Sequence, residues 1–101
     1  MNQYVYAAHA DANHAAITKA YEELMCLTFD THKLGGFVDL AVRVPTRGGP
    51  ILQFVEIKTE EGTLRQSQER FIRDWGGFVV AVVRDRGEVQ AHVARVQGRF
   101  K

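Results

Sequence analysis

A chain of 101 residues is long enough for one small domain with a modest hydrophobic core. Its composition, 46% hydrophobic and 25% charged, is that of an ordinary globular protein, and its net charge of +1 neither demands nor excludes a nucleic-acid partner, so any basic patch must be local. The single cysteine, Cys26, excludes an intrachain disulfide and a thiolate metal cluster, and its apolar neighbours indicate a buried structural thiol.

The N-terminal segment has no basic stretch and only a short apolar run. It predicts neither a signal peptide nor a transmembrane span. We therefore expect one domain over residues 1–101, in a reducing, cytoplasmic setting and without membrane contact.

The first predicted helix is capped by Asp11 or Asn13 and runs to about Leu27. Its apolar positions follow the 3.6-residue period of an α-helix: Ile17, Ala20, Tyr21, Leu24 and Leu27. Residues 1–10 are left open between an edge strand, an oligomer contact and an irregular terminus. Residues 28–34 fit either a strand or a loop.

The second half of the chain alternates between helical and strand-like patterns. A helix is expected over residues 64–75, with Leu64, Phe71, Ile72 and Trp75 as its buried side, and two glycines end it. The continuous apolar run of residues 78–83 predicts a buried strand, and valines at helical spacing predict a last helix over residues 88–96. The predicted fold is an α/β (α+β) domain of order α-β-β-β-α-β-α, in which helices flank a small mixed sheet.

A β-hairpin over residues 37–58 is the strongest local prediction. Two runs rich in β-branched and aromatic residues flank the turn Pro-Thr-Arg-Gly-Gly-Pro. A turn centred between Arg47 and Gly48 places Asp39 opposite Glu56, and alternation puts Lys58 on their face, although a bulge would shift this register by one residue. The core face then consists of Val38, Leu40, Val42, Val44, Ile51, Val55 and Ile57.

The two opposed carboxylates suggest a cation site. Like charges placed opposite each other destabilise a sheet, so we interpret Asp39 and Glu56 as ligands of Mg²⁺ or Mn²⁺ in an exposed cleft, with the carbonyl of Ile57 as a further oxygen. The Lys58 ammonium can orient a water molecule or stabilise charge on a phosphate. The alternative is a pair of solvated strand carboxylates, with Lys58 as an ion-pair partner of Glu56.

The arrangement resembles the PD-(D/E)XK nuclease superfamily, and within it the virus-type VRR-Nuc domains, small nucleases of phages and prophages. The resemblance spans roughly residues 11–84 and includes Asp-Ala-Asn-His-Ala-Ala-Ile, Lys-Leu-Gly-Gly-Phe-Val-Asp-Leu, Phe-Val-Glu-Ile-Lys-Thr, Leu-Arg-Gln-Ser-Gln-Glu-Arg-Phe and Asp-Trp-Gly-Gly-Phe-Val-Val-Ala-Val. It implies a restriction-endonuclease-like core in which Asp39, Glu56 and Lys58 are catalytic. Gln68, in the following helix, is similar to a further site residue of the family.

The same resemblance implies an Mg²⁺- or Mn²⁺-dependent DNA endonuclease. Family members of this type are homodimers that cut branched DNA such as four-way (Holliday) junctions, here in a bacterial host cell if the gene belongs to a phage. Candidate dimer contacts are Tyr4, Tyr6 and the C-terminal helix, and candidate DNA contacts are Lys33, Gly36 and Arg65.

The first helix departs from the family pattern. Family members usually offer a glutamate there, whereas the nearest residues in this chain are His14 and Ala16. The resemblance therefore implies a shorter ligand set that favours Mn²⁺ over Mg²⁺. It also leaves two alternatives open, a catalytically degenerate DNA-binding or assembly module and a small interaction domain whose acidic pair is incidental. A zinc site built from the four histidines is not expected, because their spacing along the chain is unfavourable.

Overall fold

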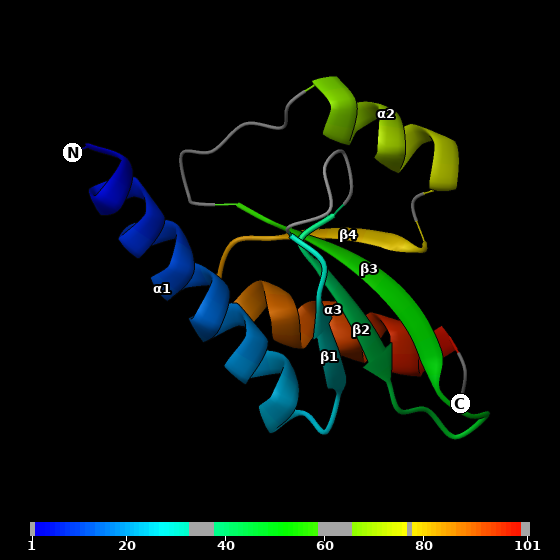
Figure 1. The fold of residues 1–101 in the computed structure, drawn as a ribbon. Coiled ribbons are helices and arrows are strands. Elements are labelled where there is room, and N and C mark those ends of the chain that lie inside the picture. Colours follow the sequence, from blue (N-terminus) through cyan, green and yellow to red (C-terminus); the bar gives the residue numbers. More distant parts are fainter. Residues whose placement is uncertain (1, 33–37, 59–65, 77, 100–101) are drawn as a thin grey trace.

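The computed structural model describes residues 2–32, 38–58, 66–76 and 78–99, and within them the side chains of residues 13–32, 38–58, 69–76 and 78–98. The described elements follow one another in the predicted order (Figure 1). They are α1 (Asn2–Glu23), β1 (Leu27–Asp30), β2 (Leu40–Val44), β3 (Ile51–Ile57), α2 (Gln66–Trp75), β4 (Val80–Val83) and α3 (Arg86–Arg99).

The four strands form one mixed sheet of order β1-β2-β3-β4. The first three strands pair antiparallel with one another, because short connections reverse the chain between them. The fourth strand runs parallel to β3, which requires a crossover, and α2 lies within that crossover. In Figure 1, α1 and α3 cover one face of the sheet and α2 lies over the other.

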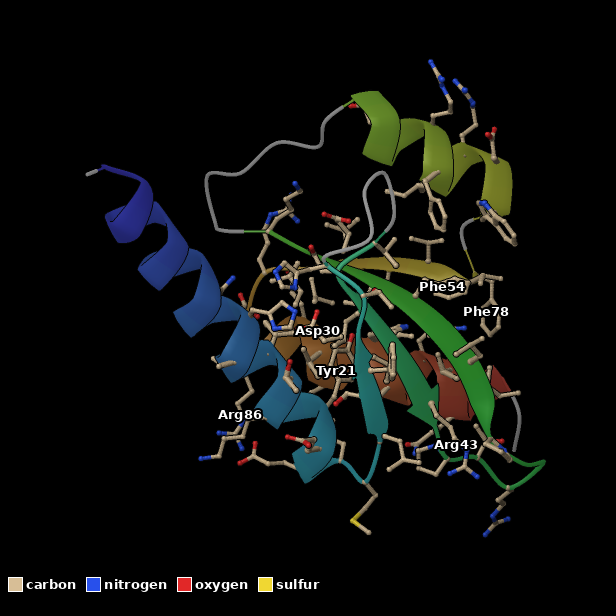
Figure 2. The ribbon with its side chains drawn as sticks, in the orientation of Figure 1. Tyr21, Asp30, Arg43, Phe54, Phe78 and Arg86 are labelled. Carbon is tan, nitrogen blue, oxygen red and sulfur yellow. The ribbon has the colours of Figure 1, made fainter. Side chains whose placement is uncertain are left out.

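The hydrophobic core lies between the sheet and the α1–α3 layer. Its buried side chains include most of the predicted helical positions and of the predicted inward face of the hairpin: Ile17, Ala20, Tyr21, Leu40, Val42, Val44, Val55, Val89, Val93 and Val96. Val38 is buried as well, whereas Leu24, Ile51 and Ile57 are only partly buried. Cys26 is buried as well, and burial raises the pKa of its thiol to about 11. An ion pair between Arg86 and Glu23, 3.0 Å apart, joins the start of α3 to the end of α1 (Figure 2).

A chain of hydrogen bonds crosses this core. The Tyr21 hydroxyl lies 2.7 Å from Nδ1 of His92, and Nε2 of His92 lies 2.9 Å from Oε1 of Gln53. An amide oxygen only accepts, so Nε2 carries the proton and Nδ1 accepts from the tyrosine hydroxyl. This neutral form agrees with burial, which, together with the charge of Arg95, lowers the pKa of His92 to about 4.

The predicted hairpin register is confirmed over the whole of β2. Leu40 pairs with Val55 and Val44 pairs with Ile51. In the connecting turn the carbonyl of Thr46 accepts a hydrogen bond from the amide of Gly49, 3.1 Å away. Gly49 has a φ of 115°, in the left-handed region that side chains disfavour. The register is therefore determined by a local turn and by strand alternation.

Two boundaries differ from the sequence prediction. The first helix begins at Asn2, so residues 2–10 are helical, and it ends at Glu23, so Leu27 lies in β1 and is exposed rather than in the core. The chain leaves α1 through Met25, whose φ of 67° stops the helical path. Although α1 has 22 residues, none of the described helices combines the length and apolar character needed to cross a membrane.

The second helix also differs in what it buries. Phe71 and Trp75 of α2 stack with their ring centroids 5.6 Å apart, and both rings lie edge-on to Phe54 of β3. Trp75 is nevertheless 58% exposed, contrary to the expectation that it belongs to the buried side. The reason is that α2 contacts the outer face of the sheet, away from the core beneath α1 and α3. Leu64 lies outside the described residues.

Candidate functional site

Asp39 lies where β2 separates from β3. Its carbonyl continues the ladder with β1 by accepting from the amide of Thr31 at 3.0 Å, and its amide donates to the carbonyl of Val55 at 3.1 Å. Val55 is the residue that pairs with Leu40, so this second bond is shifted by one residue from the register of β2 and β3. The hydrogen-bond ladder between the two strands therefore becomes irregular at Asp39. The Asp39 carboxylate Oδ2 then accepts from the amide of Ile57 at 2.8 Å. The carboxylate is thus held by backbone at the strand end.

Glu56 faces the same side of the sheet, and it is almost completely enclosed. Its exposed fraction is 1%, and it lies on an inner strand with β2 on one side and β4 on the other. The Lys58 ammonium lies 3.7 Å from Oε1 of Glu56, and the Lys58 amide donates to the carbonyl of Val83 at 3.0 Å. The expectation of an exposed cleft is therefore wrong for Glu56, since its carboxyl group lies within the structure.

Burial and the neighbouring carboxylate control the protonation of Glu56. Burial, followed by the charge of Asp39 and a side-chain hydrogen bond to it, raises the pKa of Glu56 to about 8, and Lys58 opposes this rise. At neutral pH the Asp39–Glu56 pair therefore holds a proton in the absence of a metal. A divalent cation bound between the two groups would displace that proton. The donor set, two carboxylates with a nearby backbone carbonyl at Ile57, fits a hard cation such as Mg²⁺ or Mn²⁺.

The first helix reaches this site through Asn13, one of the two residues considered above as its cap. Asn13 donates from Nδ2 to the carbonyl of Lys58, 3.3 Å away. His14 points instead toward Asp30, and Ala16 is exposed. Of Asn13, His14 and Ala16, Asn13 is therefore the residue whose side chain contacts the backbone of the strand that carries Glu56 and Lys58.

The remaining predicted site residues lie elsewhere in the chain. Gln68 belongs to the first turn of α2, but its side chain lies outside the described residues. Lys33, Gly36 and Arg65 also lie outside the described residues, and so do the side chains of Tyr4 and Tyr6. The structure therefore brings together Asp39, Glu56, Ile57 and Lys58 and leaves the DNA-contact and dimer-contact predictions as they stood.

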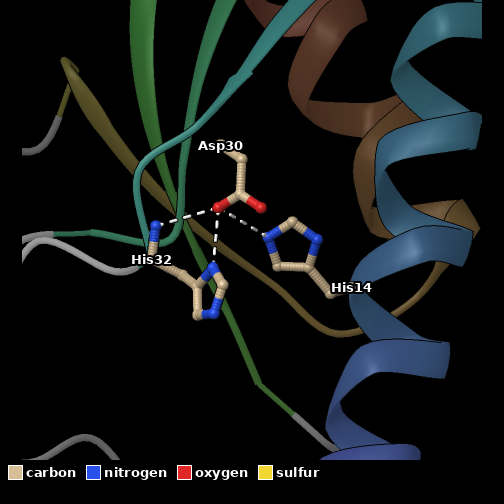
Figure 3. Close-up of side chains that lie close together, drawn as sticks. All are labelled: His14, Asp30 and His32. Atoms are coloured by element: carbon tan, nitrogen blue, oxygen red, sulfur yellow. Dashed lines mark hydrogen bonds and ion pairs between the residues drawn. The ribbon is translucent and has the colours of Figure 1, made fainter.

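A second cluster of polar side chains gathers His14, Asp30 and His32 (Figure 3). A metal site built from histidines was not expected from the sequence. The spacing of the histidines along the chain cannot show that α1 brings His14 to the end of β1. The Asp-x-His pattern at that strand end was the available signal. Hydrogen bonds from the ring and the backbone of His32 hold the pKa of Asp30 below its ordinary value.

Comparison of the chain with protein-family models, with curated proteins and with solved structures finds no match in any of the three. Function must therefore be inferred from the chemistry of the residues themselves.

Proposed function

We propose that this chain is a metal-dependent DNA endonuclease of the PD-(D/E)XK type, in which Asp39 and Glu56 hold Mg²⁺ or Mn²⁺. One observation carries the proposal. The fold places a carboxylate beside a buried carboxyl group, with an ammonium 3.7 Å away, at the end of a central strand. Such a pair is unfavourable unless a proton or a cation lies between its members.

Asp39 and Lys58 would have different roles in phosphodiester hydrolysis. The Ile57 amide holds one carboxylate oxygen of Asp39 in a defined direction at the strand end. A bound divalent ion would lower the pKa of a water molecule and polarise a phosphoryl oxygen. Lys58 supplies positive charge beside the same carboxyl group, where it can stabilise the charge that develops on the phosphate.

The topology supports the finer assignment. Three antiparallel strands follow α1, and a crossover helix then leads to a parallel strand. Asp39 precedes the second strand, and Glu56 and Lys58 lie at the end of the third. This is the arrangement that the resemblance to VRR-Nuc domains implies. We extend the proposal to branched DNA as substrate and to a homodimer that presents two sites, because two symmetric cuts require two active sites.

A second candidate is a nuclease-fold module that binds DNA without cutting it. The favouring observation is that Asn13, which carries an amide rather than a carboxylate, contacts the end of this strand from α1. With fewer negative ligands the metal must compete with the proton on Glu56 at neutral pH.

The decisive experiment incubates labelled linear, flap and four-way-junction DNA with Mg²⁺, Mn²⁺ or EDTA. Metal-dependent cleavage that is lost in Asp39→Asn supports the nuclease. Binding of DNA without cleavage in either metal supports the module. If neither binding nor cleavage occurs, or if Asp39→Asn cleaves like the wild type, the proposed site is wrong.

A further inference from the structure

We propose that His14, Asp30 and His32 form a second metal site, separate from the acidic pair, that takes a divalent transition ion of the zinc class. The site joins α1 to the end of β1, and Figure 3 shows the three side chains converging from these two elements. It does not depend on the nuclease proposal, because none of its residues is assigned to phosphodiester hydrolysis.

The distances suit a tetrahedral ion. Oδ1 of Asp30 lies 2.8 Å from Nδ1 of His32 and 3.6 Å from Nε2 of His14, and one ligand atom from each residue falls within a 4.8 Å cluster. Zinc bonds of about 2.0–2.1 Å in tetrahedral geometry separate neighbouring ligand atoms by about 3.3 Å. The two aspartate–histidine distances lie on either side of that value. A zinc ion would draw the three ligand atoms, which all lie within 4.8 Å of one another, to that separation through side-chain rotation, and His32 is the more exposed of the two histidines.

The helix side of the site is already oriented. Nδ1 of His14 lies 3.4 Å from the hydroxyl of Thr18, one turn further along α1. Nε2 of His14 is buried and has no hydrogen-bond partner within the described part of the chain, and it points at Asp30. A metal-bound histidine typically has this arrangement, in which the second ring nitrogen is held by an outer partner and the first is directed at the ion.

The strand side is held by backbone contacts. Asp30 pairs with the inward-facing Leu40, so its side chain shares the face that α1 covers. Between the two strand ligands, Thr31 is buried, and its hydroxyl donates to the carbonyl of Val38 at 2.7 Å. The His32 amide donates to Oδ1 of Asp30 at 3.0 Å, which fixes the turn that brings the His32 ring back to the carboxylate.

The ligand chemistry separates this site from the acidic pair. Two imidazoles and one carboxylate favour Zn²⁺, Co²⁺ or Ni²⁺, whereas Mg²⁺ prefers oxygen ligands alone. Three protein ligands leave a fourth position for water, and Asp30 and His32 are both exposed enough to let an ion enter. In the presence of excess Mg²⁺, a zinc-class ion should therefore select the histidine site.

The test is a calorimetric titration of the intact protein with Zn²⁺ in excess Mg²⁺, together with the visible spectrum of the Co²⁺ form. We expect one saturable site with a tetrahedral Co²⁺ spectrum. His14→Ala and His32→Ala should each weaken Zn²⁺ binding by about tenfold or more. Asp39→Asn is the matched control, and it should leave Zn²⁺ affinity unchanged.

A measurement on the wild type avoids any folding defect of the variants. On addition of Zn²⁺, the imidazole nitrogen NMR resonances of His14 and His32 should shift. Those of His92 should not shift, because both of its ring nitrogens are hydrogen-bonded within the core. Absence of saturable Zn²⁺ binding would overturn the proposal. So would binding that survives His14→Ala and His32→Ala but disappears in Asp39→Asn, because the ion would then lie at the acidic pair.

Discussion

Replacing Glu56 by glutamine should remove most of the pH dependence of stability near neutral pH. The folded pKa of Glu56, about 8, lies above its ordinary value of 4.5. The protonated carboxyl group therefore stabilises the fold fully below pH 4.5, and this contribution is lost as pH rises through 8. Glutamine resembles the protonated acid in shape and has no charge to lose. The variant should therefore keep its stability where the wild type declines.

The magnitude follows from proton linkage. Each pH unit between the two pKa values reduces the free energy of unfolding by about 1.4 kcal/mol. The cleanest window is pH 6.5 to 8, since His92, whose pKa falls from 6.5 to about 4 on folding, affects stability mainly below this window. Over that window the free energy of unfolding of the wild type should fall by about 1.5 kcal/mol.

The assay is urea denaturation of the metal-free protein, with wild type and Glu56→Gln compared at the two ends of the window. The difference between the two proteins isolates Glu56 from the other titrating groups. Asp39→Asn provides a second comparison, because it removes the charge that helps to raise the pKa, so its pH dependence should be intermediate. Equal slopes for wild type and Glu56→Gln would refute the reasoning, since Glu56 would then titrate alike in both states.

Three further predictions concern the site and the core. Lys58→Ala should still bind Mn²⁺, but its single-turnover cleavage rate should fall by about 10² or more, and an unchanged rate would leave Lys58 only an ion-pair role. Asn13→Asp should lower the Mg²⁺ concentration for half-maximal cleavage several-fold, because it adds a carboxylate next to the Lys58 carbonyl. Ala16→Glu, one turn later, should have the smaller effect, and the reverse order would count against Asn13 as the approaching position. His92→Leu should destabilise the fold by about 2 kcal/mol or more in a thermal melt, because the Tyr21 hydroxyl and the Gln53 amide would lose their buried partner.

The element order and the hairpin register could be predicted from the sequence, because both depend on local physics. Strand alternation about a turn centred between Arg47 and Gly48 placed Asp39, Glu56 and Lys58 on one face, and the observed pairing of Leu40 with Val55 follows that register. The helical spacing of the valines predicted α3, and Val89, Val93 and Val96 are buried in the structure. The period of the apolar residues shows which face of a helix or strand is apolar, and this period can be read from residues close together in the sequence.

The environment of each site was decided only by the tertiary structure. Glu56 is buried only in the packed structure, and the raised pKa of Glu56 follows from that burial and from Asp39. The contacts of Asn13 with Lys58 and of His14 with Asp30 depend on how α1 crosses the sheet. A crossing angle results from packing over the whole core, so no local sequence pattern contains it. The sequence alone therefore determined which residues share a strand face, and the packed structure determined which of them meet across elements.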